Sequence, residues 1–171
     1  MKNTLRAFIS PLHILFIIFM ILYVPSCAVK PASELDNPEY HHKAGMRHVE
    51  MGKYTESLPS FERAVDLDKK FAPAYAGMGI AYANLDDKKK ARKNAAKAQG
   101  LAGKDPDVLT LCARVWIDLR HQEKKWYKDA GKLLKKALKR DKNHEGATYY
   151  TGEFHLYQYE FNEAEDQFRK V

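Results

Sequence analysis

The chain has 171 residues, of which 45% are hydrophobic and 30% charged, with 29 Lys and Arg against 22 Asp and Glu. That length allows one domain with a small appendage, and a mild basic excess without base-stacking aromatics in a basic stripe argues against nucleic-acid binding. The two cysteines, Cys27 and Cys112, are too few and too far apart for a disulfide framework or a zinc site.

The first 26 residues have the features of an export signal. Lys2 and Arg6 precede a mostly apolar run over residues 8–24, whose uninterrupted part spans residues 14–24. A helix that crosses a bilayer needs about 20 apolar residues, so this run is the core of a signal peptide rather than a membrane span. Removing residues 1–26 leaves 27 basic against 22 acidic side chains, a net charge of +5.

Residues 24–27 read Val-Pro-Ser-Cys, which resembles the lipobox of bacterial lipoproteins apart from Pro25. The resemblance implies that Cys27 is acylated and becomes the first mature residue, with residues 27–37 as a lipid-anchored tether. Because Ala28 follows the cysteine, it also implies an outer-membrane location facing the periplasm. The alternatives are a plain secretory signal and an uncleaved anchor.

From residue 38 onward, small and apolar residues follow the spacing of a helix face. The spacing is four and then three in each of two trios: Ser57, Phe61 and Ala64, followed by Tyr75, Gly79 and Tyr82. Residues 69–73 form the turn between the two trios, which predicts a helix hairpin.

The pattern recurs after 34 residues, and once after 39. The recurring positions include Gly45, Gly79, Ala113 and Gly152 on the first helix of each hairpin, and Phe61, Ala95, Leu134 and Phe168 on the second. A period of 34 with small residues where helices touch resembles the tetratricopeptide repeat family. The resemblance implies an all-α, right-handed solenoid over residues 38–171, with repeats at 38–71, 72–105, 106–144 and 145–171, the last one incomplete.

Several positions depart from the regular pattern. Pro59 should delay the start of its helix or bend it. The five extra residues of the third repeat fall within residues 120–126. His41 and His48 lie two turns apart on one helix face without a carboxylate or cysteine beside them, so we expect packing rather than a metal site. Cys112 should pack as a small buried hydrophobic residue.

The fourth repeat stops at Val171, inside its second helix. Phe161, Ala164 and Phe168 should therefore have neighbours on one side only, and an apolar edge of that kind seeks a partner. We expect that the natural chain continues. The alternatives are that another protein covers this edge, or that the chain self-associates through it.

No motif for catalysis, metal binding or cofactor binding occurs in the sequence. The nearest feature is His144 followed by Glu145, which lacks a second histidine four residues after the first. We therefore expect neither an enzyme nor a bound cofactor. A solenoid of this kind offers a groove rather than an enclosed pocket.

In the family, the first helices of the repeats line the concave side. The resemblance implies that the partner-binding residues are His42, Met46, Ile80, Asn84, Arg114, Ile117, Tyr149, Glu153 and Tyr157. This mixed lining suits an extended or helical peptide, with Arg114 and Glu153 as orienting charges. The lysines and asparagine that clamp chaperone C-termini in one subgroup are not present at the corresponding positions.

The second helices of repeats two and three are strongly basic and should form the convex face. Their cations include Lys88, Lys89, Lys90, Arg92, Lys93, Lys97, Lys132, Lys135, Lys136, Lys139 and Arg140. The simplest interpretation is a solvated face. The alternative is contact with anionic lipid headgroups or an acidic partner.

The sequence thus predicts a lipid-anchored scaffold that binds protein or peptide partners in the cell envelope. Lipoproteins of this build resemble the pilotins and assembly factors that serve pili, secretion systems or outer-membrane insertion. Two alternatives remain open. The repeats are the N-terminal interaction arm of a longer envelope enzyme or wall-binding protein, or the chain binds lipid or polymer through its basic convex face.

Overall fold

The computed structural model describes residues 36–171, so the expected signal peptide, the acylated Cys27 and most of the tether lie outside the described residues. The described part is all-helical, as the sequence predicts. Its elements are α3 (Pro38–Glu50), α4 (Tyr54–Leu67), α5 (Ala72–Asn84), α6 (Lys88–Ala102), α7 (Pro106–Asp118), the 3-10 helix η1 (Leu119–His121), α8 (Trp126–Arg140), α9 (Glu145–Leu156) and α10 (Phe161–Phe168).

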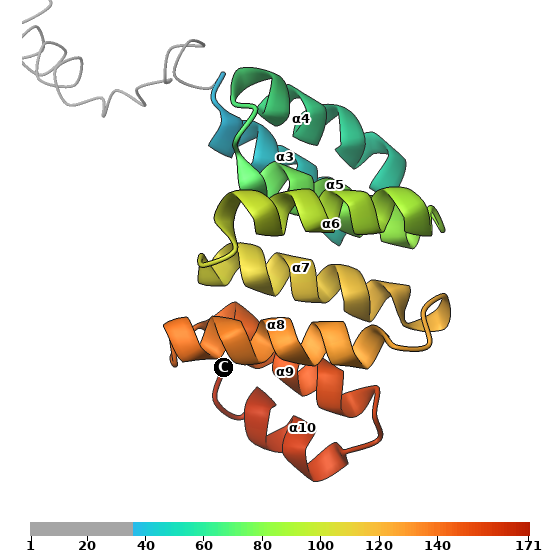
Figure 1. Ribbon diagram of the computed structural model, residues 1–171, viewed down its shortest axis with the longest axis vertical. Coiled ribbons are helices and arrows are strands. Elements are labelled where there is room, and N and C mark those ends of the chain that lie inside the picture. The colour runs from blue at the N-terminus through green and yellow to red at the C-terminus, as the bar shows by residue number, and fades with distance from the viewer. Residues whose placement is uncertain (1–35) are drawn as a thin grey trace, which may run out of the picture. The chain divides into compact units, whose positions relative to one another are not determined.

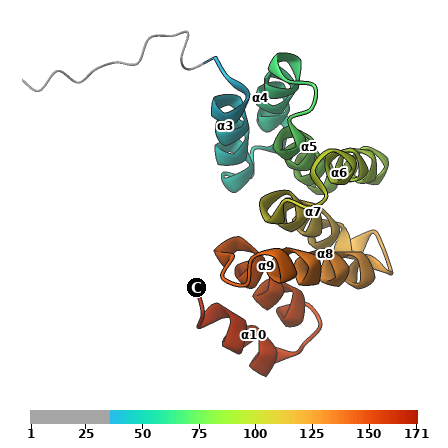
Figure 2. The ribbon, with the colours of Figure 1, turned by 60° about the vertical axis from the view of Figure 1, so that its left-hand side comes forward.

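The α-helices pair into four hairpins: α3 with α4, α5 with α6, α7 with α8, and α9 with α10. Each first helix also packs against the next first helix, and each second helix packs against the first helix that follows it. The hairpins are stacked from α3 and α4 at the top of Figure 1 to α9 and α10 at the bottom. Figure 2 shows the second helices α4, α6 and α8 on one side of this stack.

The sequence marks several helix starts with capping residues. The side chain of Asn37 accepts a hydrogen bond from the Tyr40 amide, and Pro38 occupies the first turn, where its missing N–H costs nothing. Asp105 caps α7 in the same way, and His144 caps α9 through its ring. These caps satisfy amides at the helix start that have no partner within the helix, and so fix where the helices begin.

The expectation that Pro59 delays the start of α4 is wrong. The helix begins at Tyr54, and Pro59 lies inside it on the exposed side. Inside a helix, a proline removes the hydrogen bond that its own amide would donate to the carbonyl of Thr55, and its ring crowds that carbonyl, so a bend at this point stays a prediction. The turn before the helix is set instead by Gly52, whose positive φ of 71° favours glycine.

Small residues let the helices approach closely at the joints between them. The ring of Phe61 on α4 lies against Gly45 of α3 and Gly77 of α5, so close that a Cβ at either glycine would collide with it. Gly152 has the same relation to Phe168 within the last hairpin. Gly79 packs near Val115 of the next first helix. The glycines therefore hold space for a neighbouring side chain.

The extra residues of the third repeat form η1 and the turn that leads into α8. Gln122 fastens this segment to the preceding repeat, because its amide nitrogen donates to the carbonyl of Ala83 at 3.2 Å and to Asp86 Oδ1 at 2.9 Å. Glu123 accepts a hydrogen bond from Arg92 of α6 at 3.1 Å. The insertion is thus tied down by polar contacts.

Cys112 is fully buried, and its Sγ lies 3.6 Å from the carbonyl oxygen of Ala95 on α6. Burial raises the pKa of its thiol to about 12. His41 pairs with Asp36 at 2.8 Å, and Nδ1 of His48 is buried without a hydrogen-bond partner. Among the described residues, no group of three or more His, Cys, Asp or Glu side chains could hold a metal ion.

Candidate functional site: the first-helix groove

The face formed by α3, α5, α7 and α9 is called the first-helix groove here. Two rows of equivalent positions cross it, with one residue from each repeat. The equivalent positions are Met46, Ile80, Arg114 and Glu153, of which Ile80 is buried in the core, and beside them Glu50, Asn84, Asp118 and Tyr157, the residue that follows α9. Because the repeat spacing places equivalent residues side by side, Asn84 and Asp118, which are 34 positions apart in sequence, become neighbours.

A polar network joins α5 and α7 near their carboxyl ends. Asn84 donates from Nδ2 to Asp118 Oδ2 and to the carbonyl of Ile80, both at 3.0 Å. Nε of Arg114 lies 3.8 Å from the same carboxylate oxygen. Burial raises the pKa of Asp118 to about 6, and the Arg114 charge and the Asn84 hydrogen bond only partly oppose this. The network is therefore built around a carboxyl group that is costly to ionise.

Tyrosines and arginines dominate the end of the groove formed by α7 and α9. The guanidinium of Arg114 lies over the ring of Tyr150 at 5.7 Å, and that of Arg120 over the ring of Tyr157 at 4.1 Å. The hydroxyl of Tyr149 donates to Glu153 at 3.3 Å. The negative charge of Glu153 and partial burial raise the pKa of this hydroxyl. The exposed rings are thus held by charged neighbours.

A hollow of about 360 Å³ lies in the same groove, beside the amino ends of the first helices. Its lining includes Glu39, His42, Pro73, Asp107, His144 and Tyr150. Nδ1 of His144 accepts from the Ala147 amide at 3.0 Å, so its Nε2 carries the proton and donates to Asp107 at 3.0 Å. Burial lowers the pKa of His42 and raises that of Tyr150 to about 12.

The structure brings most of the expected partner-binding residues into one region but excludes two of them. Asn84, Arg114, Tyr149, Glu153 and Tyr157 lie in or beside the polar and aromatic cluster. His42 and Met46 are half-buried on α3, where His42 packs against two phenylalanine rings. Their role in binding stays a prediction.

The expectation that Ile80 and Ile117 face a partner is wrong. They are 0% and 1% exposed and belong to the core. The counterparts of Ile117 in the first two repeats, Val49 and Ala83, are equally buried, so this position lies in the seam between successive first helices. A side chain in that seam is covered by the neighbouring helix and cannot touch a ligand.

The resemblance also places Asp118 among the outward residues of the groove, whereas Arg120 and Tyr150 are not expected there from the sequence. The position of Asp118, one repeat after Asn84, was a usable signal, because equivalent polar residues on adjacent first helices come within hydrogen-bond reach. Arg120 lies in the irregular segment η1, where the repeat register gives no guide. Tyr150 points between α7 and α9, which only their packing determines.

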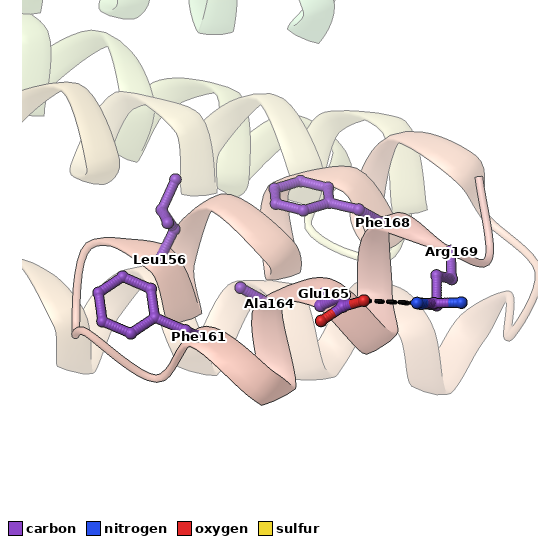
Figure 3. A pocket seen from close by; sticks show the side chains of 6 residues that line it. All are labelled: Leu156, Phe161, Ala164, Glu165, Phe168 and Arg169. Carbon is purple, nitrogen blue, oxygen red and sulfur yellow. Dashed lines mark hydrogen bonds and ion pairs between the residues drawn. The ribbon is translucent and has the colours of Figure 1, made fainter.

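A second apolar surface lies at the end of the stack, where Leu156 of α9 and Phe161, Ala164 and Phe168 of α10 line a hollow of about 490 Å³ (Figure 3). Leu156 is 42% exposed and Phe168 37%, whereas their counterparts Ile117 and Leu134 are 1% and 2% exposed. Ala164 is only 2% exposed, so it lies at the base of the hollow, and the exposed apolar surface comes from the other three side chains. Self-association through this edge stays a prediction.

Within residues 36–171, no helix is both long enough and apolar enough to span a bilayer. The same residues include no cluster of possible metal ligands, and the groups described above are paired with one another in hydrogen bonds and ion pairs. The first-helix groove presents a hollow, exposed aromatic rings and charged side chains held in place, which are the properties of a binding surface.

Comparison with known proteins agrees with this architecture. Residues 48–115 match the tetratricopeptide repeat family. A crystal structure of MamA is 21% identical over 81% of this chain and 78% of that chain, with a TM-score of 0.51. The structure of MamA 41-end from Desulfovibrio magneticus RS-1 is 16% identical over 80% and 75% of the two chains, with a TM-score of 0.52. No curated protein matches the sequence.

Proposed function

From the match of residues 48–115 to the tetratricopeptide repeat family and the geometry of the groove, we propose that the chain is a scaffold that binds a peptide segment of a protein partner in the first-helix groove. The observation that carries this proposal is the cluster of exposed tyrosines held by fixed charges on α7 and α9. Tyrosine and arginine are the residues that most often dominate binding energy at protein interfaces.

The cluster is ordered before any partner arrives. Arg120 stacks on Tyr157, Tyr149 is bonded to Glu153, and Arg114 is held between Asp118 and Tyr150. A preorganised surface loses little side-chain entropy on binding, so more of the contact energy appears as affinity. The hollow beside His42 and Tyr150 lies in the same groove and offers room for one apolar side chain of an extended segment.

A peptide library displayed on phage tests this proposal, with the immobilised chain as the target. Peptides that enrich on the natural protein should lose binding when Tyr149 is changed to Ser. The matched control is Tyr127→Ser, because Tyr127 is 41% exposed, close to the 42% of Tyr149, but lies on the second helix α8. Peptides that respond equally to both changes, or no enrichment at all, would count against the groove.

We further propose that the scaffold works in the cell envelope, attached through lipid on Cys27. The support is in the sequence: Lys2 and Arg6, a short apolar run, and the Val-Pro-Ser-Cys segment that ends in Cys27. Acyl chains on Cys27 would hold the groove near the membrane, where assembly factors of pili, secretion systems or outer-membrane complexes act.

Labelling with radioactive palmitate in a bacterial host tests the anchor. The natural chain should incorporate the label, and Cys27→Ala should abolish it and accumulate the unprocessed precursor. Cys112→Ala is the control, since Cys112 is buried in α7. Persistent labelling of the Cys27→Ala chain would refute attachment at this residue, whatever the groove binds.

A further inference from the structure

A basic hollow lies on the outer side of the second hairpin, away from the first-helix groove. It encloses about 420 Å³ between α5 and α6. Its lining includes Tyr75, Met78, Tyr82, Lys90, Lys93 and Lys97. No carboxylate is among the lining residues, so three ammonium groups and two aromatic rings share one concave surface.

The three lysines form one stripe of α6, because they are spaced three and four residues apart. Like charges at these spacings repel one another and weaken a helix. Two tyrosines of α5 offset part of this cost: Lys90 lies 4.9 Å from the centre of the Tyr82 ring, and Lys97 lies 5.1 Å from that of Tyr75. The rings therefore hold two of the ammonium groups at the edges of the hollow.

These charges are only partly compensated within the chain. Lys90 forms an ion pair with Asp87 at 3.0 Å. Within the described residues, neither Lys93 nor Lys97 forms an ion pair with a carboxylate. An anion in the hollow would relieve the repulsion along the stripe, because it would contact two cations that have no acidic partner.

The chemistry of the hollow selects the kind of anion. Lysine ammonium groups bind phosphate as point charges, and a phosphate offers several oxygens to several donors at once. The hydroxyl of Tyr75 already donates to the carbonyl of Lys69 at 3.2 Å, so this residue presents its ring. Together with Met78, the two rings form an apolar wall for carbon atoms attached to the phosphate.

We propose that the hollow between α5 and α6 is a binding site for a phosphate group with an attached carbon skeleton, as in a phosphorylated small molecule or a phospholipid headgroup. The site does not depend on the proposed peptide binding, because it lies on the opposite side of the hairpin and shares no residue with the groove. Its ligand is held by Lys93 and Lys97, with Lys90 at the rim.

Binding of anions to the basic surface of α8 must be distinguished from binding at this site. Lys132, Lys135, Lys136 and Lys139 are exposed there and attract anionic particles in general. Of these four lysines, only Lys135 lines a hollow, one of about 270 Å³ whose lining also includes Leu134, Leu138 and Phe154. Lys136 is the best control, because it occupies the position of Lys97 one repeat later, 39 residues on, and is likewise exposed. Binding that is only diffuse should depend on Lys136 as much as on Lys97.

The experiment uses residues 33–171, which form a compact unit with its own buried core. Inorganic phosphate is titrated at constant ionic strength while amide signals of α6 are followed by NMR. In a parallel arm, the protein is sedimented with vesicles of phosphatidylglycerol or of phosphatidylcholine. The variants are Lys93→Gln, Lys97→Gln and the control Lys136→Gln, all at exposed positions that the fold tolerates.

Saturable shifts at residues 88–97 that weaken about tenfold in Lys93→Gln and Lys97→Gln, but not in Lys136→Gln, support the site. A response to inorganic phosphate without vesicle binding indicates a soluble ligand, and binding to phosphatidylglycerol vesicles that needs Lys93 indicates a lipid headgroup. The proposal fails if neither probe gives a saturable response. It also fails if Lys136→Gln weakens binding as much as Lys97→Gln does.

Discussion

Asn84 donates a hydrogen bond to Asp118, the residue at the same position one repeat later, with 3.0 Å between Nδ2 and Oδ2. This contact joins two successive first helices at the floor of the groove, where the side chain of Asp118 is largely withdrawn from solvent. The pair thus links the distance between α5 and α7 to the protonation state of the buried carboxyl group of Asp118.

The buried carboxyl of Asp118 should make the fold more stable in mild acid than at neutral pH. Burial raises the pKa of Asp118 from its ordinary value of 3.8 to about 6 in the fold, so folding favours the protonated form. The stability that this provides is complete below pH 3.8 and is lost as the pH rises through about 6. Asp118→Asn should therefore stabilise the chain at pH 7.5 by about 1 to 3 kcal/mol.

Urea unfolding at several pH values between 4.5 and 8 checks this prediction. The natural chain should lose stability across that range more steeply than Asp118→Asn does. Asp166→Asn, at an exposed position of α10, provides the comparison for a surface carboxylate. Equal pH profiles for the natural chain and Asp118→Asn would show that this carboxyl group is not costly to ionise.

Gly77→Ala should destabilise the fold by ~1 to 3 kcal/mol, because the new methyl group would meet the ring of Phe61 closer than 3.0 Å. Gly100→Ala is the matched change inside α6, where no atom lies within 4 Å of the added Cβ. This second change should stabilise by about 0.5 to 1 kcal/mol through helix propensity. Thermal melts in which both changes had the same sign would mean that the joint at Phe61 is looser than described.

His144 should contribute to stability mainly through its cap on α9. His144→Ala removes the acceptor for the Ala147 amide and should cost ~1 kcal/mol. His144→Asn keeps a good capping acceptor and should recover most of this loss, although it gives up the bond to the exposed Asp107. If urea unfolding finds Asn no better than Ala, the contact with Asp107 matters more than the cap.

Cys112 should resist alkylation while the chain is folded. Its thiol is buried, and its pKa of about 12 leaves almost no thiolate at pH 8. Treatment with iodoacetamide followed by peptide mass spectrometry should leave Cys112 unmodified in buffer and modify it fully in urea. Rapid modification in buffer would reveal opening of the seam between α6 and α7.

The sequence predicts the helices well because the evidence for them is local. Phe61, Ala95, Leu134 and Phe168 recur at fixed spacing, and caps such as Asn37 and Asp105 lie directly before the helices they start. The 3.6-residue period indicates which face of each helix packs within its own hairpin.

The groove is harder to predict, because exposure there depends on the neighbouring helix. Ile80 and Ile117 have the spacing of outward residues, yet the close approach of successive first helices buries them. The ring of Tyr150 lies under Arg114 for the same reason, since packing between α7 and α9 decides where it points. Whether such a side chain is exposed or buried depends on the distance to the neighbouring helix. The residues of one helix alone do not determine that distance.

The position of Phe61 also bears on how the chain unfolds. One ring belongs to the interiors of two repeats, because it fills the space above Gly45 and Gly77 together. Opening the first hairpin must therefore uncover the second, so the two should unfold as one cooperative unit. Phe168, by contrast, packs against Gly152 and Tyr149 of its own hairpin. The amides of α10 should consequently exchange with solvent well before those of α5.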